Sequence, residues 1–171
     1  MHVGFVVPEL RRLDEIKSDA MCLCLYQEDW PLRGTPGLVD WRLSGHISRQ
    51  REVGWISCAP GEVVLMPLSP RLPSEKLLLV GMGSVDDGLG RDRIATGLHA
   101  MFEALERIRV HATLLHLPGR PWRTSTEEVV TVLLDVAAEH PEHDEVILVE
   151  PVDAHDTMLR VIETRRSART E

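Results

Sequence analysis

The chain has 171 residues, of which 43% are hydrophobic and 27% charged, and its formal net charge is −8. This length is typical of one domain, which can bury a core without disulfides or structural metals. No apolar run approaches the roughly 20 residues of a membrane-spanning helix, and the first residues resemble a strand more than a signal peptide. The acidic balance argues against general binding to nucleic acid or to an anionic membrane, because phosphate affinity needs clustered Lys and Arg.

The chain has three cysteines, an odd number. Cys22 and Cys24 stand two apart in a predicted strand, so both side chains point to the same face. We expect these two and Cys58 to be buried free thiols of a cytoplasmic protein. A redox or metal role would need more partners than the sequence offers.

Only the C-terminal end is basic, and we expect residues 166–171 to form a polar basic tail after a domain of residues 1–165. Basic residues at the end of a last helix usually complement the helix dipole. This tail therefore does not by itself predict a nucleic-acid-binding arm.

The first half of the chain predicts four strands, at residues 3–7, 20–26, 62–68 and 76–80, and a brief helix or turn over residues 10–16. The run from Ala20 to Tyr26 is continuously apolar, which is typical of a strand covered on both faces. Residues 27–36 read as a surface loop. Val39, Leu43 and Ile47 then stand four apart, and this spacing predicts a single amphipathic helix from Gly37 to near Gly54.

The second half alternates helices and strands. The predicted strands cover residues 112–117 and 145–150. Three helical faces recur at helical spacing: Ile94, Leu98, Met101, Phe102, Leu105 and Ile108; Val129, Val132, Leu133, Val136 and Ala137; and Met158, Leu159 and Ile162. This alternation predicts an α/β fold, a single three-layer domain with a mostly parallel sheet between helices.

Three segments of the first half carry a family resemblance: PLRGTPGLVDWRLSGHISR, GEVVLMP and RLPSEKLLLVGMG. With these segments the chain resembles the amino-terminal domain of the leucyl aminopeptidase, or cytosol aminopeptidase, family. The resemblance covers roughly residues 1–165 and is dense from Leu32 to Gly83. It implies a macro-domain-like α/β fold with a mixed sheet.

In that family the domain precedes a larger domain that carries two metal ions and the peptidase chemistry. The chain has no N-T-D-A-E-G-R-type segment and no cluster of lysine and aspartate that would ligate paired zinc or manganese. The resemblance therefore implies a stand-alone, non-catalytic relative with no catalytic residue, no metal and no cofactor. We expect no turnover of a leucyl substrate, even with added zinc or manganese.

One turn could hold a small ligand. Gly81, Met82 and Gly83, followed by Ser84, connect a predicted strand to a helix, and amide groups in such a turn can bind a phosphate. This would suit ADP-ribose, which true macro domains bind. A plain turn is the alternative, because the longer glycine fingerprint is missing and Asp86 and Asp87 bring negative charge.

The segment HPEHDE, residues 140–145, mixes histidines with carboxylates, a combination that can bind zinc. It lies at a predicted helix end and resembles a solvated segment, and only a tertiary contact could add His155. We therefore expect no metal site.

The four tryptophans outnumber the other aromatic residues. Trp30, Trp55 and Trp122 fall in or near loops, where packing explains most such residues, but exposed tryptophan is also a frequent interface anchor. Trp41 lies about 160° from Leu43 around a helix of 3.6 residues per turn. Either this helix is buried on two sides, or Trp41 faces a partner.

Three functions remain open. The first is a non-catalytic domain that acts through protein contacts, by self-association or by docking to a partner enzyme, with Trp41, Trp30 and Trp55 at the interface. The second is a binder or hydrolase of ADP-ribose or another nucleotide, of the macro-domain type. The third is a regulatory subunit of a separately encoded metallo-aminopeptidase.

Overall fold

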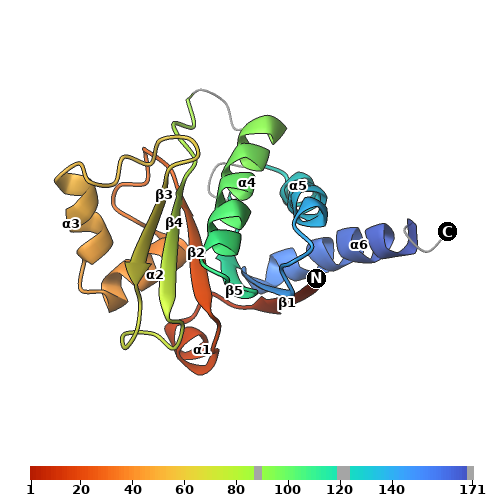
Figure 1. Cartoon of the computed structure of the whole chain (residues 1–171), viewed down its shortest axis with the longest axis horizontal. Helices are drawn as coiled ribbons and strands as arrows, with labels where there is room; N and C mark the ends of the chain where they lie inside the picture. Colours follow the sequence, from red (N-terminus) through yellow and green to blue (C-terminus); the bar gives the residue numbers. More distant parts are fainter. Residues whose placement is uncertain (87–89, 119–123, 169–171) are drawn as a thin grey trace.

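Figure 1 shows a central sheet with helices on both faces, in a computed structural model that describes residues 1–86, 90–118 and 124–168. The strands are β1 (His2–Val6), β2 (Ala20–Leu25), β3 (Val63–Pro67), β4 (Lys76–Gly81), β5 (Ala112–His116) and β6 (Glu145–Val149). The helices are α1 (Leu10–Glu15), α2 (Gly34–Arg42), α3 (His46–Glu52), α4 (Arg91–Arg107), α5 (Thr126–Glu139) and α6 (Val152–Ala168). The strand order is β1-β6-β5-β2-β4-β3. Every neighbouring pair is parallel except β3 and β4, which are antiparallel. The predicted fold class, a mixed and mostly parallel sheet between helices, is confirmed.

Strand β2 supplies two separate cores because its side chains alternate between the faces of the sheet. Its even-numbered residues, including Cys22 and Cys24, pack with α4, α5 and α6. Its odd-numbered residues, including Leu23, pack with α1, α2 and α3. All six residues of β2 are buried, as the continuous apolar run predicted. The three cysteines are buried and free, as expected.

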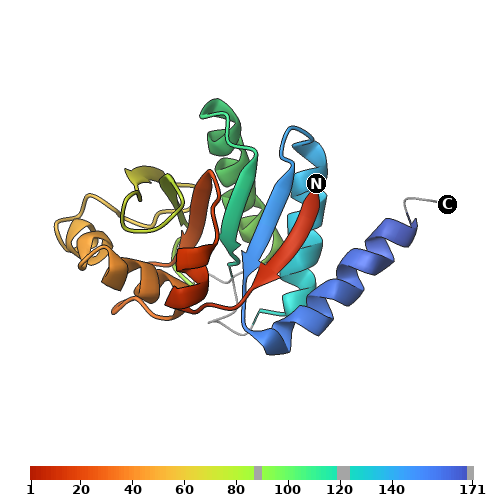
Figure 2. The same ribbon diagram turned by 90° about the horizontal axis from the view of Figure 1, so that it is seen from below.

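The helices of the second half bury the faces that their periodicity predicted, with one exception. In α4 the five positions from Ile94 to Leu105 are buried, and Ile108 is partly buried. In α6 the buried stripe is Ala154, Met158 and Ile162, whereas Leu159 is 41% exposed. Placing Leu159 on the buried face was wrong. Only a narrow stripe of α6 meets the rest of the protein, because its second half projects away from the sheet (Figure 2).

Helix α6 continues to Ala168, and residues 169–171 lie outside the described part of the chain. The predicted boundary between a domain of residues 1–165 and a tail of residues 166–171 stays a prediction. Within the three described ranges, no helix is both long and apolar enough to cross a membrane.

The single helix predicted from Gly37 to Gly54 is wrong, because the structure has two helices there. Ser44 and Gly45 adopt left-handed backbone conformations, with φ of 57° and 76°, and these end α2. Asp40 of α2 then accepts hydrogen bonds from the backbone N–H groups of Ile47 (2.8 Å) and Ser48 (3.2 Å) in the first turn of α3. The periodicity suggested one helix because Val39 and Ile47 are both buried on the same side.

Asp40 is only 7% exposed, and its carboxylate joins α2 to the otherwise uncapped start of α3. Replacing it by alanine leaves two donors of a short helix without their acceptor. We expect Asp40→Ala to lower the free energy of unfolding by about 2 kcal/mol in urea denaturation. Glu52→Ala, which removes an exposed carboxylate of the same helix, is the control and should change the stability little. Equal losses in the two variants would contradict the role of Asp40.

Candidate functional site

The sheet has a topological switch point between β2 and β5. Strand β2 leads to α2 on one face of the sheet, whereas the neighbouring β5 leads to α5 on the other face. Open α/β sheets bind ligands outside the carboxyl ends of strands at such a point. The residues that begin this edge are Tyr26, after β2, and Leu117, after β5. The sequence analysis did not predict this switch point, because one amino-acid sequence does not reveal the order of the strands in the sheet.

The loop after β2 is held by Arg51 of α3. Its guanidinium donates hydrogen bonds to the carbonyl oxygens of Tyr26 (3.0 Å), Gln27 (3.0 Å) and Asp29. The carboxylate of Asp29 accepts a hydrogen bond from the N–H of Tyr26 at 2.9 Å. The loop is therefore rigidly tied to α3 before any ligand or partner arrives.

The predicted glycine turn lies next to this edge, at the end of β4. The amide groups of Gly81, Met82 and Gly83 donate at 2.8 Å to carbonyl oxygens of Glu62, Leu25 and Cys58, in that order. A Cβ atom at Gly81 would lie 2.1 Å from the carbonyl oxygen of Ala59, so a side chain has no room there.

Ser84 completes the turn. Its hydroxyl donates to the carboxylate of Glu28, which also accepts the N–H of Val85 at 3.1 Å. Gly81 therefore allows the backbone near Ala59 to pass close to the turn. The three amides that could bind a phosphate already donate to carbonyl oxygens. Ligand binding by Gly81–Ser84 stays a prediction.

The described part of this edge carries the carboxylates of Glu28, Asp29 and Glu150 beside the guanidinium groups of Arg51 and Arg93. The hydrogen bond from Ser84 lowers the pKa of Glu28, whereas burial raises the pKa of Asp29. Burial also raises the pKa of Cys24, and the nearby Glu150 and Asp29 add to the rise. Glu150 is 1% exposed and accepts the N–H of Leu117 at 3.2 Å. Carboxylates at this position oppose the binding of an anion.

The described part of the edge beside β5 and β6 is closely packed. The hollow beside β5 and β6 has a volume of about 10 Å³, which is room for about one water molecule. It is lined by Leu117, Pro118, Thr124, Thr126, Val129, Glu150 and Met158. Residues 119–123, which directly follow this stretch and include Trp122, lie outside the described residues. Burial raises the pKa of the Cys58 thiol to about 11, which disfavours its thiolate form at neutral pH.

A second candidate site is a protein surface around α2 and α3, which we call the tryptophan face. It contains Trp30, Trp41 and Trp55, whose side chains are 55%, 68% and 58% exposed. Helix α2 is not buried on two sides, since Trp41 points away from the core. The guanidinium of Arg42 lies 5.9 Å from the ring of Trp41, and that of Arg51 lies 5.9 Å from the ring of Trp30.

The tryptophan face is hollowed as well as exposed. A hollow of about 580 Å³ lies beside Trp41, and one of about 560 Å³ lies beside Trp30. The exposure of the three tryptophans agrees with the interface predicted from the sequence, but their role at an interface stays a prediction.

The histidines of residues 140–145 are not solvated, which corrects the expectation. His140 and His143 are 8% and 2% exposed, because α4 covers them and Phe102 stacks on the ring of His140. His140 Nδ1 lies 2.7 Å from a carboxylate oxygen of Glu106. No group of three potential metal ligands occurs in residues 1–86, 90–118 and 124–168.

His143 is held in one tautomer by its two partners. Its Nδ1 donates to the carbonyl oxygen of Val110 at 3.2 Å, since a carbonyl only accepts. Its Nε2 therefore accepts the hydroxyl of Thr113, at 3.1 Å. Burial lowers the pKa of His143, so the native structure stabilises the neutral ring.

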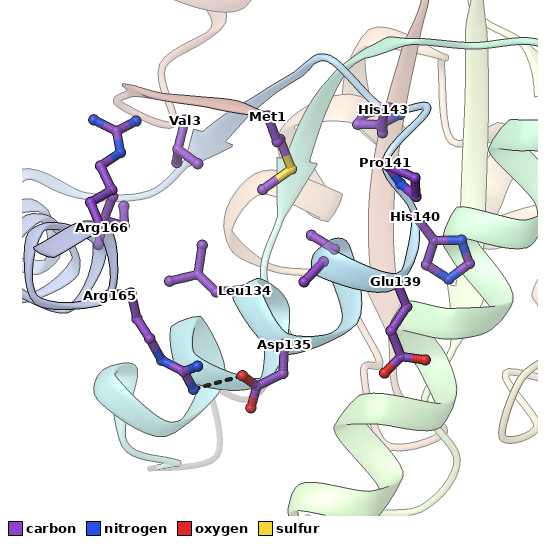
Figure 3. Close-up of a pocket in the computed structure, with 13 residues that line it drawn as sticks. Met1, Val3, Leu134, Asp135, Glu139, His140, Pro141, His143, Arg165 and Arg166 are labelled. Atoms are coloured by element: carbon purple, nitrogen blue, oxygen red, sulfur yellow. Dashed lines mark ion pairs between the residues drawn. The ribbon is translucent and has the colours of Figure 1, made fainter. Parts of the chain in front are cut away.

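These two histidines border a groove of about 580 Å³, the α5–α6 groove (Figure 3). Val3 lies on one side of it, Leu134 of α5 lies opposite, and Arg165 and Arg166 of α6 lie along a third side. Ile162 of α6 also lines the groove. Arg165 pairs with Asp135 at 2.6 Å.

A model of the cytosol aminopeptidase family, N-terminal domain, matches residues 25–137 of the chain. The chain belongs to this family. The resemblance stated from its motifs is confirmed. No curated protein sequence matches this aminopeptidase N-terminal domain.

Solved structures share the fold of this aminopeptidase N-terminal domain at low sequence identity. The macrodomain of Mycobacterium tuberculosis DarG is 11% identical, with a TM-score of 0.69, and the match covers 87% of this chain and 98% of that one. A Trypanosoma brucei macrodomain in complex with ADP-ribose is 16% identical, with a TM-score of 0.73 and coverage of 94% and 69%. A tomato leucine aminopeptidase mutant is 13% identical, with a TM-score of 0.65, and the match covers 94% of this chain but 35% of the tomato enzyme. These likenesses show the fold alone.

The buried neutral His143 makes the stability of the domain sensitive to acid. Below the ordinary histidine value of 6.5, the unfolded chain binds a proton that the native ring resists. The free energy of unfolding should therefore be highest above pH 6.5 and fall as the pH drops, for example from about 7.5 to 5.5. Urea titrations at both pH values should show a smaller fall for His143→Gln than for the exposed control His46→Gln. An equal fall in the two variants would contradict this account.

Proposed function

We propose that this aminopeptidase N-terminal domain is non-catalytic and acts through protein–protein contacts made by the tryptophan face. Membership of the family, without the metal-binding motif of the peptidase chemistry in these 171 residues, supports the first part. The observation that carries the second part is that three tryptophans close together in sequence are each more than half exposed. Interfaces are enriched in tryptophan and arginine, and truncating such anchors is unusually costly.

The charge of the tryptophan face indicates the kind of partner. Residues 30–55 contain four arginines but only Asp40 and Glu52 as carboxylates, in a chain of net charge −8. Asp40 is already engaged by α3, and Arg51 by the loop after β2. Arg42 pairs with Asp14, so the exposed Arg33 and Arg49 supply the positive charge of this aromatic surface, and its complement is an acidic protein surface. Both a partner enzyme and a second copy can offer one, and a separately encoded metallo-aminopeptidase is the partner enzyme that the family suggests.

A second candidate is a nucleotide binder or hydrolase of the macro-domain type. It is supported by the fold shared with a macrodomain whose complex contains ADP-ribose and with an Oceanobacillus iheyensis macrodomain with ADP. The position of Gly81, Met82, Gly83 and Ser84 beside the topological switch point supports it as well. The occupied amides and the carboxylates of Glu28, Asp29 and Glu150 weigh against it, which is why protein contacts come first.

Trp41→Ala tests the leading proposal. Loss of a central interface tryptophan costs about 2 kcal/mol or more, which weakens binding by more than about tenfold. Sedimentation velocity of the domain with a metallo-aminopeptidase encoded in the same genome should show a mixed complex that Trp41→Ala weakens. Glu103→Ala, at an exposed carboxylate of α4 on the opposite face of the sheet, should leave that complex unchanged. Self-association weakened by Trp41→Ala would support the tryptophan face equally, and indifference of both kinds of complex to Trp41→Ala would contradict it.

Calorimetry with saturating ADP-ribose separates the two candidates. On the leading proposal, the wild-type domain releases no binding heat and shows no shift in melting temperature. Saturable heat that Ser84→Ala diminishes, without loss of the fold by circular dichroism, would instead establish the nucleotide site. Ser18→Ala, a serine away from this turn, is the matched control.

A further inference from the structure

Strand β1 forms one edge of the sheet and lacks two sequence features that commonly protect an edge from pairing. It reads HVGFV, without a charged residue or a proline. The N–H of His2 donates to Asp144, and the carbonyl of Val6 accepts from Glu150, so the even-numbered residues turn their main-chain groups toward β6. In a parallel ladder the groups of Val3 and Phe5 consequently point to the open side. Such an edge is a template for a further strand.

Helix α6 extends beyond this same edge. Figures 1 and 2 both show its C-terminal half projecting away from the sheet on the side of β1. Its outer surface carries two exposed apolar side chains, Val152 at 66% and Leu159 at 41%. Leu159 lies at the middle of the helix, and the α5–α6 groove separates α6 from the first half of β1.

The charges of α6 complement a reversed copy of itself. Its first half carries Asp153 and Asp156 and no basic residue. Its second half carries Arg160, Arg165 and Arg166 against one carboxylate, Glu163, and Arg165 also pairs with Asp135 of α5. Two such helices packed antiparallel bring each acidic half beside a basic half, with the two copies of Leu159 near the centre.

These features fit one symmetric arrangement. If β1 pairs with β1 of a second copy in antiparallel fashion, the two-fold axis stands perpendicular to the sheet. That axis keeps both α6 helices on the same face and runs them in opposite directions. The contact is isologous, so it closes as a dimer and does not grow further.

We infer that a second copy of this chain docks on β1 and α6, joining the two six-stranded sheets into one across a two-fold axis. This homodimer does not rest on the tryptophan face, which lies around α2 and α3, at the other end of the sheet (Figure 1). It leaves Trp41 open for a partner, so one dimer presents two tryptophan faces.

Two variants test the dimer. Val3→Pro removes an outward N–H while sparing the groups that pair with β6, a position where an edge strand accepts proline. Leu159→Glu places two carboxylates at the two-fold axis. Each should raise the dissociation constant of the dimer by at least about tenfold in sedimentation velocity. Both should keep the circular dichroism of the wild type, and Trp41→Ala should dimerise as the wild type does.

Amide hydrogen exchange gives an independent test at the level of single residues. As the protein is concentrated through the monomer–dimer transition, exchange of the Val3 and Phe5 amides should slow. Exchange of the Gly4 amide, which faces β6, should change little. Leu159→Glu should remove the slowing.

A wild-type protein that stays monomeric at all concentrations overturns this inference. A dimer that resists both Val3→Pro and Leu159→Glu, or one in which Val3 and Phe5 exchange unchanged, overturns it too. A dimer that only Trp41→Ala dissociates would place self-association on the tryptophan face. In that case the proposed function stands and the β1–α6 dimer falls.

Discussion

Burial of strand β2 on both faces is the constraint on which the rest of the structure depends. A strand with apolar side chains on both faces needs a helical layer on each side. The even-numbered residues of β2 require α4, α5 and α6, and the odd-numbered residues require α1, α2 and α3. The crossovers from β2 and from β5 therefore leave the sheet in opposite directions. The topological switch point, a position where open α/β sheets bind ligands, accompanies this two-sided core.

At that point, side chains at the carboxyl edge of the sheet hold the neighbouring loops by hydrogen bonds. Arg51 donates to a backbone carbonyl of the loop after β2, and Glu28 accepts the backbone N–H of Val85. The buried Glu150 accepts the backbone N–H of Leu117. The guanidinium of the same Arg51 lies 5.9 Å from the ring of Trp30, so one side chain contacts both the loop after β2 and the tryptophan face.

The sequence analysis singled out Trp30, Trp41 and Trp55, which the structure exposes, but it was wrong about other features of the fold. The sequence placed Trp41 outside the buried stripe of its helix, because a period of 3.6 residues per turn puts Trp41 and Leu43 on different sides. The sequence analysis missed the break between α2 and α3 because Val39 and Ile47 have the spacing expected within one continuous helix. At the break, the carboxylate of Asp40 accepts hydrogen bonds from the first turn of α3. His140 and His143 resembled a solvated segment because only α4, distant in sequence, buries them. The edge of β1 had no sequence signal, since strand order is not a local property.

The sequence by itself determined the fold class, the two-sided burial of β2 and the family, because periodicity and motif spacing are local patterns. It also located a turn at Gly81–Gly83 and left open whether that turn binds a ligand. The tertiary structure shows that carbonyl groups of Glu62, Leu25 and Cys58 accept hydrogen bonds from the amides of the turn, and that a Cβ at Gly81 would meet the chain at Ala59. Only the tertiary structure, likewise, left β1 at the edge beneath a projecting α6 and exposed Trp41. These outcomes depend on which distant segments become neighbours, and no local pattern records that.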